Sequence, residues 1–422
     1  MSKLQGDKKQ RIFFRIVSAG IILSCIFLLY DPSGEMIEET SSGKLTEGAY
    51  MSTNMPSTIP EGIVRESDEN LEDEQEAFSY ESLSSLEAVE TISVGTEEKK
   101  VKGIYVTGPV AGSKKMDELV HLVETTKLNA MVIDIKNDSG EVTYKMDYEL
   151  AKQIGATKNY IPDIQSMIQK LKEKDIYLIA RVVAFKDPIL AEKVPAYSLK
   201  KKDGTIFRDS QGLAWVNPYH TDVWNYIFNI AKQAANLGFD EIQFDYIRFS
   251  TDGGMKDVTF GGKEATISKA DVITQFTKYI TENLQPFGVK VSADVYGAII
   301  SSEADSKIVG QDYEDMSNHL DCICPMIYPS QFAKGSYGVS NPDSSPYDII
   351  YRSLLDSQEK LAENQDITVR PWLQDFTATW LSPHITYDTE QIRAQIEAVY
   401  ASGYEEWILW NASNNYSVGA LQ

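Results

Sequence analysis

Short runs of β-branched and aromatic residues alternate, from Lys102 onward, with longer stretches in which apolar residues recur at every third or fourth position. A run of the first kind is typical of a buried strand, and a stretch of the second kind indicates a helix with one buried face. The predicted strands are residues 103–107, 130–135, 176–184, 240–247, 289–295, 321–327, 367–373 and 404–410. The predicted helices contain residues 116–123, 161–171, 223–234, 273–284, 350–361 and 392–399.

This alternation predicts an α/β fold, and its strand number predicts a closed (β/α)8 barrel of the TIM type. The helix after the fifth strand has a weak pattern, and a helix after the eighth strand is expected to be absent. A doubly wound open sheet is the alternative fold. Open sheets that bind nucleotides usually carry a glycine-rich phosphate loop after the first strand, and Pro109 interrupts the only such candidate, residues 103–112.

Polar residues recur at every second position in two neighbouring strands. Glu241, Gln243 and Asp245 share one face of the fourth strand, while Ile242, Phe244 and Tyr246 share the other and would face the helices. In the fifth strand, Asp294 follows Ser292 on the inward face. Because barrel enzymes carry their chemistry at the C-terminal ends of the strands, Asp245 and Asp294 become candidate catalytic residues.

The other strands add inward-facing polar and aromatic candidates at the same level. These are Asp134, Lys136, Arg181, Tyr328, Arg370, Trp372, Gln374 and Asn411. Acids, cations and aromatic rings that converge on one face are typical of a carbohydrate site, since sugars stack on rings and hydrogen-bond through their hydroxyls. The competing interpretation is structural, because a buried Asp beside an Arg, such as Asp245 with Arg248, is more often an ion pair than a catalyst.

Metal and cysteine chemistry find little support. None of the four histidines lies in a metal-binding arrangement, and we expect no cofactor and no resident metal. A loop calcium at residues 252–257 is the one alternative. Cys322 and Cys324 lie on a buried strand and are expected to belong to the core.

The charge is unevenly distributed along the 422 residues, whose formal net charge is −22. This acidity argues against a nucleic-acid partner. Residues 1–30 carry five Lys or Arg and one Asp, and they end in an uncharged apolar run at residues 16–30. This run predicts an uncleaved membrane anchor with the rest of the chain outside the cell. A cleaved signal peptide is the rival, although no small-residue cleavage site follows the run, and lipidation of Cys25 is a weaker one.

Residues 31–100 carry four Lys or Arg against eighteen acids and are rich in Ser, Thr, Glu and Gly. Such a composition cannot bury enough apolar surface to offset the entropy of ordering, so we predict a disordered linker. The predicted organisation is therefore an anchor at residues 1–30, a linker at 31–100 and a barrel at 101–422.

Several strings between residues 101 and 416 resemble the bacterial putative glycosyl hydrolase domain family, long described as a domain of unknown function. The strings are ARVVAFKD (180–187), WVNPY (215–219), GFDEIQFDYIRF (238–249), MIYPS (326–330), RPWLQDF (370–376) and WNA (410–412). The resemblance implies a (β/α)8 barrel distantly similar to α-amylase-like and endo-α-1,4-polygalactosaminidase-like hydrolases. It further implies a catalytic Asp245 and a partner Asp294, with Glu241 or Asp375 as substitutes for the partner. The matching strings supply further substrate-binding candidates: Asp187, Trp215, Asn217, Tyr246, Arg248, Asp375 and Trp410.

Three hypotheses follow for the function. The first is a membrane-anchored glycoside hydrolase that cleaves an extracellular or cell-wall polysaccharide by carboxylate acid/base catalysis. The second is a barrel that binds a glycan without cleaving it and serves as an envelope scaffold. The third is an enzyme in which carboxylates hold a metal on the same barrel.

Overall fold

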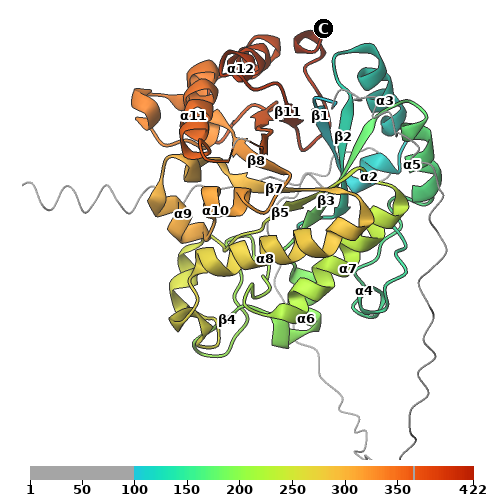
Figure 1. Ribbon diagram of the computed structural model, residues 1–422, viewed down its shortest axis with the longest axis vertical. Helices are drawn as coiled ribbons and strands as arrows, with labels where there is room; N and C mark the ends of the chain where they lie inside the picture. The colour runs from blue at the N-terminus through green and yellow to red at the C-terminus, as the bar shows by residue number, and fades with distance from the viewer. Residues whose placement is uncertain (1–98, 365) are drawn as a thin grey trace, which may run out of the picture. The chain divides into compact units, whose positions relative to one another are not determined.

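The computed structural model describes residues 99–364 and 366–422, which fold around a ring of parallel strands (Figure 1). The ring consists of β1 (Lys102–Val106), β2 (Ala130–Lys136), β3 (Tyr177–Val183), β5 (Glu241–Asp245), β7 (Lys290–Tyr296), β8 (Cys322–Ile327), β10 (Trp372–Gln374) and β11 (Trp407–Trp410). Neighbours along the chain pair in parallel, β11 pairs with β1, and β10 pairs with both β8 and β11. The sheet therefore closes on itself, which confirms the predicted barrel and excludes the open sheet.

The seventh strand of the barrel is divided in two. β9 (Thr368–Val369) pairs with β8, and β10 begins after Arg370 and Pro371. Proline has no backbone N–H and cannot donate to the ladder, so the pairing is interrupted at Pro371. The predicted strand at residues 367–373 is thus present as two short pieces.

Helices surround the strands (Figure 1). The six long ones are α3 (Lys115–Thr125), α5 (Ile164–Lys172), α7 (Thr221–Leu237), α8 (Lys269–Leu284), α11 (Pro346–Lys360) and α12 (Thr389–Ala401). Each matches one predicted helix, although α5 begins at Ile164 rather than Ile161, because Asp163 caps it by accepting a hydrogen bond from the Ser166 amide. The shorter ones are α2 (Gly108–Ala111), α4 (Glu149–Gln153), α6 (Pro188–Lys193), α9 (Glu303–Val309) and α10 (Tyr313–Ser317).

Two expectations about weak helices are also confirmed. The connection after β7 contains only the short helices α9 and α10. After β11 the described chain forms a single 3-10 turn, Val418–Ala420.

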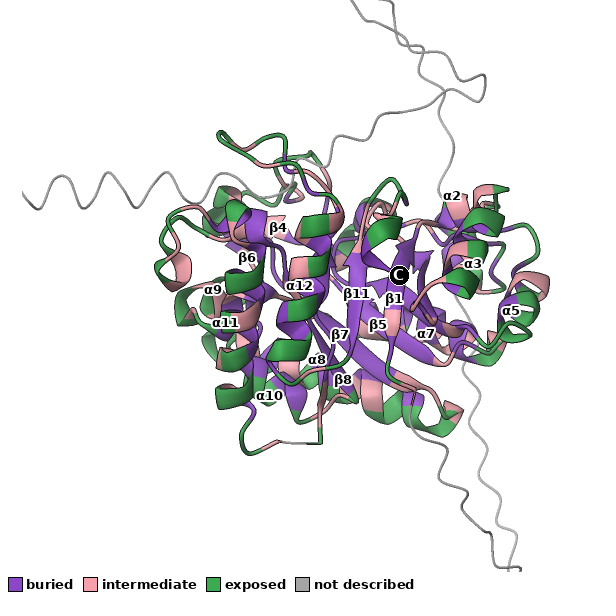
Figure 2. Ribbon diagram, turned by 90° about the horizontal axis from the view of Figure 1, so that it is seen from above, coloured by how far each residue is buried: buried purple, intermediate pink, exposed green. Residues whose placement is uncertain are grey.

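The barrel has two apolar cores. The larger one lies between the strands and the helices, and the helices expose their outer faces (Figure 2). The smaller one lies inside the barrel and contains Tyr105, Tyr328, Trp372 and both described cysteines. Cys322 and Cys324 are buried and unoxidised, with their sulfur atoms 3.6 Å apart, in agreement with the predicted core position.

A small lobe extends from the barrel at the C-terminal ends of β3 and β5. Its strands β4 (Lys200–Lys201) and β6 (Val258–Thr259) pair in antiparallel fashion, and Figure 1 shows β4 at the lower edge of the molecule with α6 nearby. The sequence analysis did not predict this lobe, since its strands have only two residues each. It adds a wall of aromatic residues beside the strand ends.

The predicted anchor at residues 16–30 and the linker up to residue 98 lie outside the described residues. Within residues 99–364 and 366–422, none of the helices has the length and apolar character needed to cross a membrane.

Candidate active site

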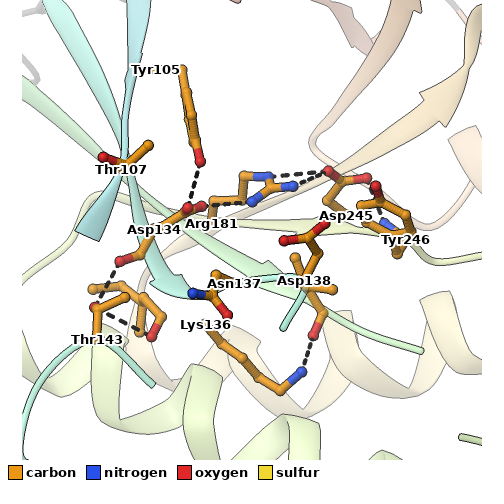
Figure 3. A network of polar contacts seen from close by, with 12 residues as sticks. Tyr105, Thr107, Asp134, Lys136, Asn137, Asp138, Thr143, Arg181, Asp245 and Tyr246 are labelled. Atoms are coloured by element: carbon orange, nitrogen blue, oxygen red, sulfur yellow. Dashed lines mark hydrogen bonds and ion pairs between the residues drawn. The ribbon is translucent and has the colours of Figure 1, made fainter. Parts of the chain in front are cut away.

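A chain of charged hydrogen bonds joins four neighbouring strands at the C-terminal end of the barrel (Figure 3). Arg181 on β3 donates from Nε and Nη2 to Oδ2 of Asp245 on β5, over 3.1 and 2.5 Å. Its Nη1 donates to Oδ1 of Asp134 on β2, over 2.6 Å. The hydroxyl of Tyr105 on β1 donates to the other oxygen of Asp134, over 2.5 Å. One guanidinium thus holds two carboxylates that come from different strands.

The position of Asp245 follows from the turn before β5. Gly238 ends α7 in the left-handed conformation, with φ of 101°, which glycine adopts without a steric cost. Asp240 then accepts a hydrogen bond from the Leu178 amide over 2.8 Å and ties the start of β5 to β3. This fixes the alternation along β5, so that Asp245 is its last residue and faces the interior.

Two aromatic rings hold the Arg181 guanidinium from the side. Its central carbon lies 5.6 Å from the ring centre of Tyr105 and 5.5 Å from that of Trp410. These two rings stack on each other at 4.1 Å, and the ring of Trp372 meets that of Trp410 edge-on at 5.5 Å. The predicted platforms Trp372 and Trp410 therefore lie beside the charged cluster, together with Tyr105, which was not predicted.

Asp294 lies on β7, the strand next to Asp245, and is 1% exposed. Its Oδ1 accepts a hydrogen bond of 2.6 Å from Nε1 of Trp372. Burial, and after it the negative charge of Asp245, raises the pKa of Asp294 well above its usual value, although the Trp372 hydrogen bond and Arg181 act in the opposite direction. Burial also raises the pKa of Asp134, against the opposing effect of Arg181. The two neighbouring aspartates of the prediction thus have different environments, with Asp245 bound to Arg181 and Asp294 favoured in its protonated form.

Glu241 occupies a deeper layer of the barrel and is completely buried. Both of its oxygens accept hydrogen bonds from Nη1 of Arg370, at 2.8 and 3.0 Å, and Nε of Arg370 binds Glu406 at 2.8 Å. Ser292 and Tyr177 also donate to Glu241. Glu241 and Arg370 therefore belong to a closed interior network rather than to the Asp245 cluster. Gln243 is buried as well and donates to the sulfur of Cys324 over 3.2 Å.

Lys136 does not face the barrel interior, and the expectation from simple alternation is wrong. The pairing between β2 and β3 shifts by one residue between Asp134 and Lys136, so that Asp134 pairs with Arg181 and Lys136 with the outward-facing Val182. Such a bulge reverses the direction of the side chains that follow it. Lys136 is fully buried and pairs with Asp187, Nζ to Oδ2, at 2.9 Å. Asp187 also caps α6 through the Leu190 amide, so both residues connect loops behind the cluster.

Arg248 does not pair with Asp245, and the structure corrects that expectation. The ion partner of Asp245 among the described residues is Arg181. Arg248 instead lies over the rings of Tyr246 and Trp215, with its central carbon 5.1 and 5.5 Å from their centres. Tyr246 adopts a left-handed conformation, with φ of 49°, and its amide donates to Oδ1 of Asp245. The alternation of β5 therefore ends at Asp245, and Tyr246 turns toward Arg248 and Trp215 instead of following the prediction that it faces the helices.

The remaining predicted residues form the loops around the cluster. Tyr328 meets Phe376 edge-on at 5.8 Å, and Gln374 joins the loops after β8 and β10 through Ser330 and Phe376. Asp375 accepts two hydrogen bonds from Ser417, and Asn411 donates to the backbone oxygen of Asp375. Asn217 accepts from the Tyr219 amide in a turn of the lobe, so it is not part of the cluster.

Two polar residues near the cluster were missed by the sequence analysis. Nζ of Lys186 lies 3.2 Å from Oδ2 of Asp138 and 5.0 Å from the ring centre of Tyr246. The side chain of Asp138 is 27% exposed, against 8% for that of Asp245, so it is the more accessible carboxylate. Its place directly after the second strand, and the place of Lys186 in the string at residues 180–187, were the available signals.

Among the residues that the structure describes, no cluster of three or more His, Cys, Asp or Glu side chains could hold a metal ion. Asp252, in the candidate calcium loop, accepts hydrogen bonds from the Ser210 amide and the Ser250 hydroxyl.

Comparison with known proteins agrees with this site and fold. Residues 103–416 match the family described as "Putative glycosyl hydrolase domain". The match spans most of the chain, so the protein belongs to this family, and its class is that of the glycosidases. No curated protein matches the chain.

Solved structures give the same picture of the fold. The glycoside hydrolase domain of PgaB (BpsB) from Bordetella bronchiseptica is similar with a TM-score of 0.54 at 13% identity, over 76% of this chain and 98% of that one. A hypothetical protein from Ruminiclostridium thermocellum is 38% identical, with a TM-score of 0.42, over 46% of this chain and 97% of that one. The glycoside hydrolase domain of PelA from Pseudomonas aeruginosa is 10% identical, with a TM-score of 0.43, over 75% and 96%.

Proposed function

We propose that this protein is a membrane-anchored glycoside hydrolase that cleaves an extracellular or cell-wall polysaccharide, with Asp245 and Asp294 as its catalytic pair. The observation that carries the proposal is the contrast between these neighbouring carboxyl groups. Arg181 donates two hydrogen bonds to Asp245, while burial and the charge of Asp245 raise the pKa of Asp294. Glycoside hydrolysis requires one ionised carboxylate and one protonated carboxylic acid.

In this mechanism Asp245 is the nucleophile or base. Its negative charge faces the positive charge that develops on the sugar ring in the transition state. Oδ1 of Asp245 is oriented by the Tyr246 amide, and Oδ2 is held by Arg181. Arg181 in turn is fixed by Asp134 and by the Tyr105 and Trp410 rings. The carboxylate therefore needs little reorganisation when the reaction begins.

Asp294 is the proposed acid that protonates the leaving oxygen. Its raised pKa keeps the proton available near neutral pH, and the Trp372 indole holds the carboxyl group in place. The rings of Trp372, Trp410 and Tyr328 are the proposed platforms on which sugar units stack.

The second candidate function is a barrel that binds a glycan without cleaving it. The near-complete burial of Asp294 favours this alternative, because an acid must reach the leaving oxygen. It would retain the aromatic rings and the Arg181 network but would not need the protonated Asp294.

Release of reducing ends by the full-length protein in detergent, across envelope polysaccharides and exopolysaccharides, separates the two candidates. A hydrolase releases reducing ends from at least one polymer and loses this activity in an Asp245→Asn variant. Binding without release in both proteins supports the scaffold.

A further inference from the structure

Arg248 differs from every other buried cation in the part of the chain that the structure describes. The buried Lys and Arg residues there are Lys136, Arg181, Lys186, Arg248 and Arg370. Four of them lie within 3.2 Å of a carboxylate oxygen. Arg248 is only 7% exposed and has no such partner among the described residues. Removal of a cation from water without an opposite charge is unfavourable, so this position calls for an explanation.

The protein occupies only one edge of the Arg248 guanidinium. Nη1 donates to the backbone oxygen of Phe249 over 2.9 Å. Nε is buried, and no described residue accepts a hydrogen bond from it. The Nε and Nη2 side of an arginine presents two parallel N–H donors, which match the two oxygens of a carboxylate or of a phosphate. This is the side of Arg248 that carries no protein partner in the described chain.

The surroundings hold the guanidinium in a fixed plane. The rings of Tyr246 and Trp215 contact it, and they meet each other at 5.7 Å with an angle of 66°. Nε1 of Trp215 donates to Asp209 over 3.0 Å, which fixes the indole. Ring contacts compensate part of the lost hydration, but they leave the N–H groups without acceptors. An arginine that is oriented by rings and left with free donors is prepared for an anion.

Arg248 also lies next to the proposed catalytic carboxylate. Tyr246, whose ring contacts Arg248, donates its amide to Oδ1 of Asp245. The same ring contacts Lys186 at 5.0 Å, and Arg248 is among the charges that act on Tyr296 at the end of β7. A group bound at Arg248 would therefore belong to a sugar in or beside the cleavage site.

We propose that Arg248 binds an anionic group on the substrate, so that the polysaccharide carries carboxylate or phosphate groups on or beside the sugar at the cleavage site. This inference rests on the proposed hydrolase function and specifies its substrate class. The lobe contributes to the selection, because Trp215, one of the rings that orient Arg248, comes from it. A neutral polymer leaves the Arg248 donors unpaired, whereas an acidic polymer satisfies them.

The test compares substrate pairs that differ only in charge. The carboxylate pair is polygalacturonate and its carboxyl-reduced form, and a glucosylated teichoic acid and dextran serve as the phosphate and neutral arms. The full-length protein, Arg248→Lys and Arg248→Gln are assayed for release of reducing ends. Binding is measured in parallel by affinity electrophoresis in an Asp245→Asn background, which prevents turnover. Arg208→Gln is the matched control, since Arg208 lies in the same lobe but is 48% exposed and pairs with Glu192.

We expect the wild type to prefer an acidic polymer, and Arg248→Gln to reduce that preference by about ten- to a hundredfold. Arg248→Lys keeps the charge without the two parallel donors and should fall between the two. The ratio of rates on the charged and neutral polymers is independent of how much of a variant is folded, because both substrates meet the same molecules. Arg208→Gln should leave the ratio unchanged.

An equal loss on charged and neutral polymers in Arg248→Gln would overturn the inference and leave the hydrolase proposal intact, as would a wild type that prefers neutral polymers. Arg248-dependent binding of an acidic polymer without any release of reducing ends would support the inference and refute the hydrolase. The absence of Arg248-dependent binding to every acidic polymer would also refute the inference.

Discussion

Arg181 donates two hydrogen bonds to the same oxygen, Oδ2, of Asp245, and leaves Oδ1 to the amide of Tyr246. The two oxygens of the carboxylate therefore differ. Oδ2 carries the ion pair, while Oδ1 receives a single backbone donor and is the oxygen better suited to contact a sugar. The following predictions test this arrangement.

Asp245→Asn retains the shape of the side chain and removes its charge. If Asp245 faces a cationic transition state, the rate should fall by at least about 10³-fold while the fold is retained. Arg181 keeps Asp134 as a partner in the variant, so the melting temperature should change little. Turnover and melting temperature are measured on one purified sample. A destabilised variant that remains active in proportion to its folded fraction would show that the residue is structural only.

Arg181→Gln should be strongly destabilising, because it leaves two buried carboxylates, Asp134 and Asp245, without a cation. Loss of one partner of a buried pair typically costs about 3–5 kcal/mol. The control is Arg208→Gln, which breaks an exposed pair with Glu192 and should cost no more than about 1 kcal/mol. Denaturant unfolding gives both values, and equal losses in the two variants would contradict the assigned role of Arg181.

Asp294 makes stability depend on pH with a defined sign. Its pKa is raised in the folded protein, while the unfolded chain releases this proton at about pH 3.9. Its contribution to stability is therefore complete below the unfolded pKa and is lost as the pH rises through the folded pKa. Asp294→Asn keeps an oxygen for Trp372 and is neutral at every pH, so the melting temperature of the variant should rise relative to the wild type as pH increases. A difference that stays constant with pH would contradict this environment.

The same shift predicts a pH effect on catalysis. If Asp294 is the acid, wild-type activity should fall as the pH rises through its folded pKa, since the carboxyl group then has no proton to give. The pH profile of kcat/KM checks this, and Asp294→Asn should lack that alkaline limb.

Deletion of residues 31–98 should leave the melting temperature of the protein essentially unchanged. The composition of this segment predicts no packed structure, and few contacts are expected to cross such a boundary. Calorimetry of the full chain and the shortened chain makes the comparison. A drop of several degrees would show that the segment packs on the barrel.

Protease added outside intact cells should free a soluble fragment by cutting between residues 31 and 100. The basic residues before the apolar run at 16–30, and the poor cleavage site after it, motivate this topology. Immunoblotting of the medium detects the fragment, and recovery of the whole protein in the cytosol would refute the anchor.

The sequence pattern was sufficient for the strands and the long helices, because both are defined by the local period of apolar residues. The alternation along β5 also placed Glu241, Gln243 and Asp245 in the interior correctly. The prediction failed for Lys136, where the bulge after Asp134 changes the direction of the chain, and for Tyr246, whose left-handed backbone ends the strand. Neither event leaves a periodic signal.

The identity of ion partners was the second limit. Arg248 is three residues from Asp245 in sequence, yet the partner of Asp245 is Arg181, 64 residues away on the neighbouring strand. Such a pair depends on the register between β3 and β5, which a single sequence does not specify. Asp138 and Lys186 were missed for the same reason, since they are brought together from two separate loops.

The charged network of Glu241, Arg370 and Glu406 in the depth of the barrel has a consequence for how this family can change over time. Replacement of any one member leaves a buried charge without its counterpart, whereas joint replacement by apolar residues of similar volume is often tolerated. The three positions come from β5, from the break in the seventh strand and from the turn before β11. We therefore expect them to vary together among relatives, as either a complete ionic set or a complete apolar one, with intermediates purged by selection.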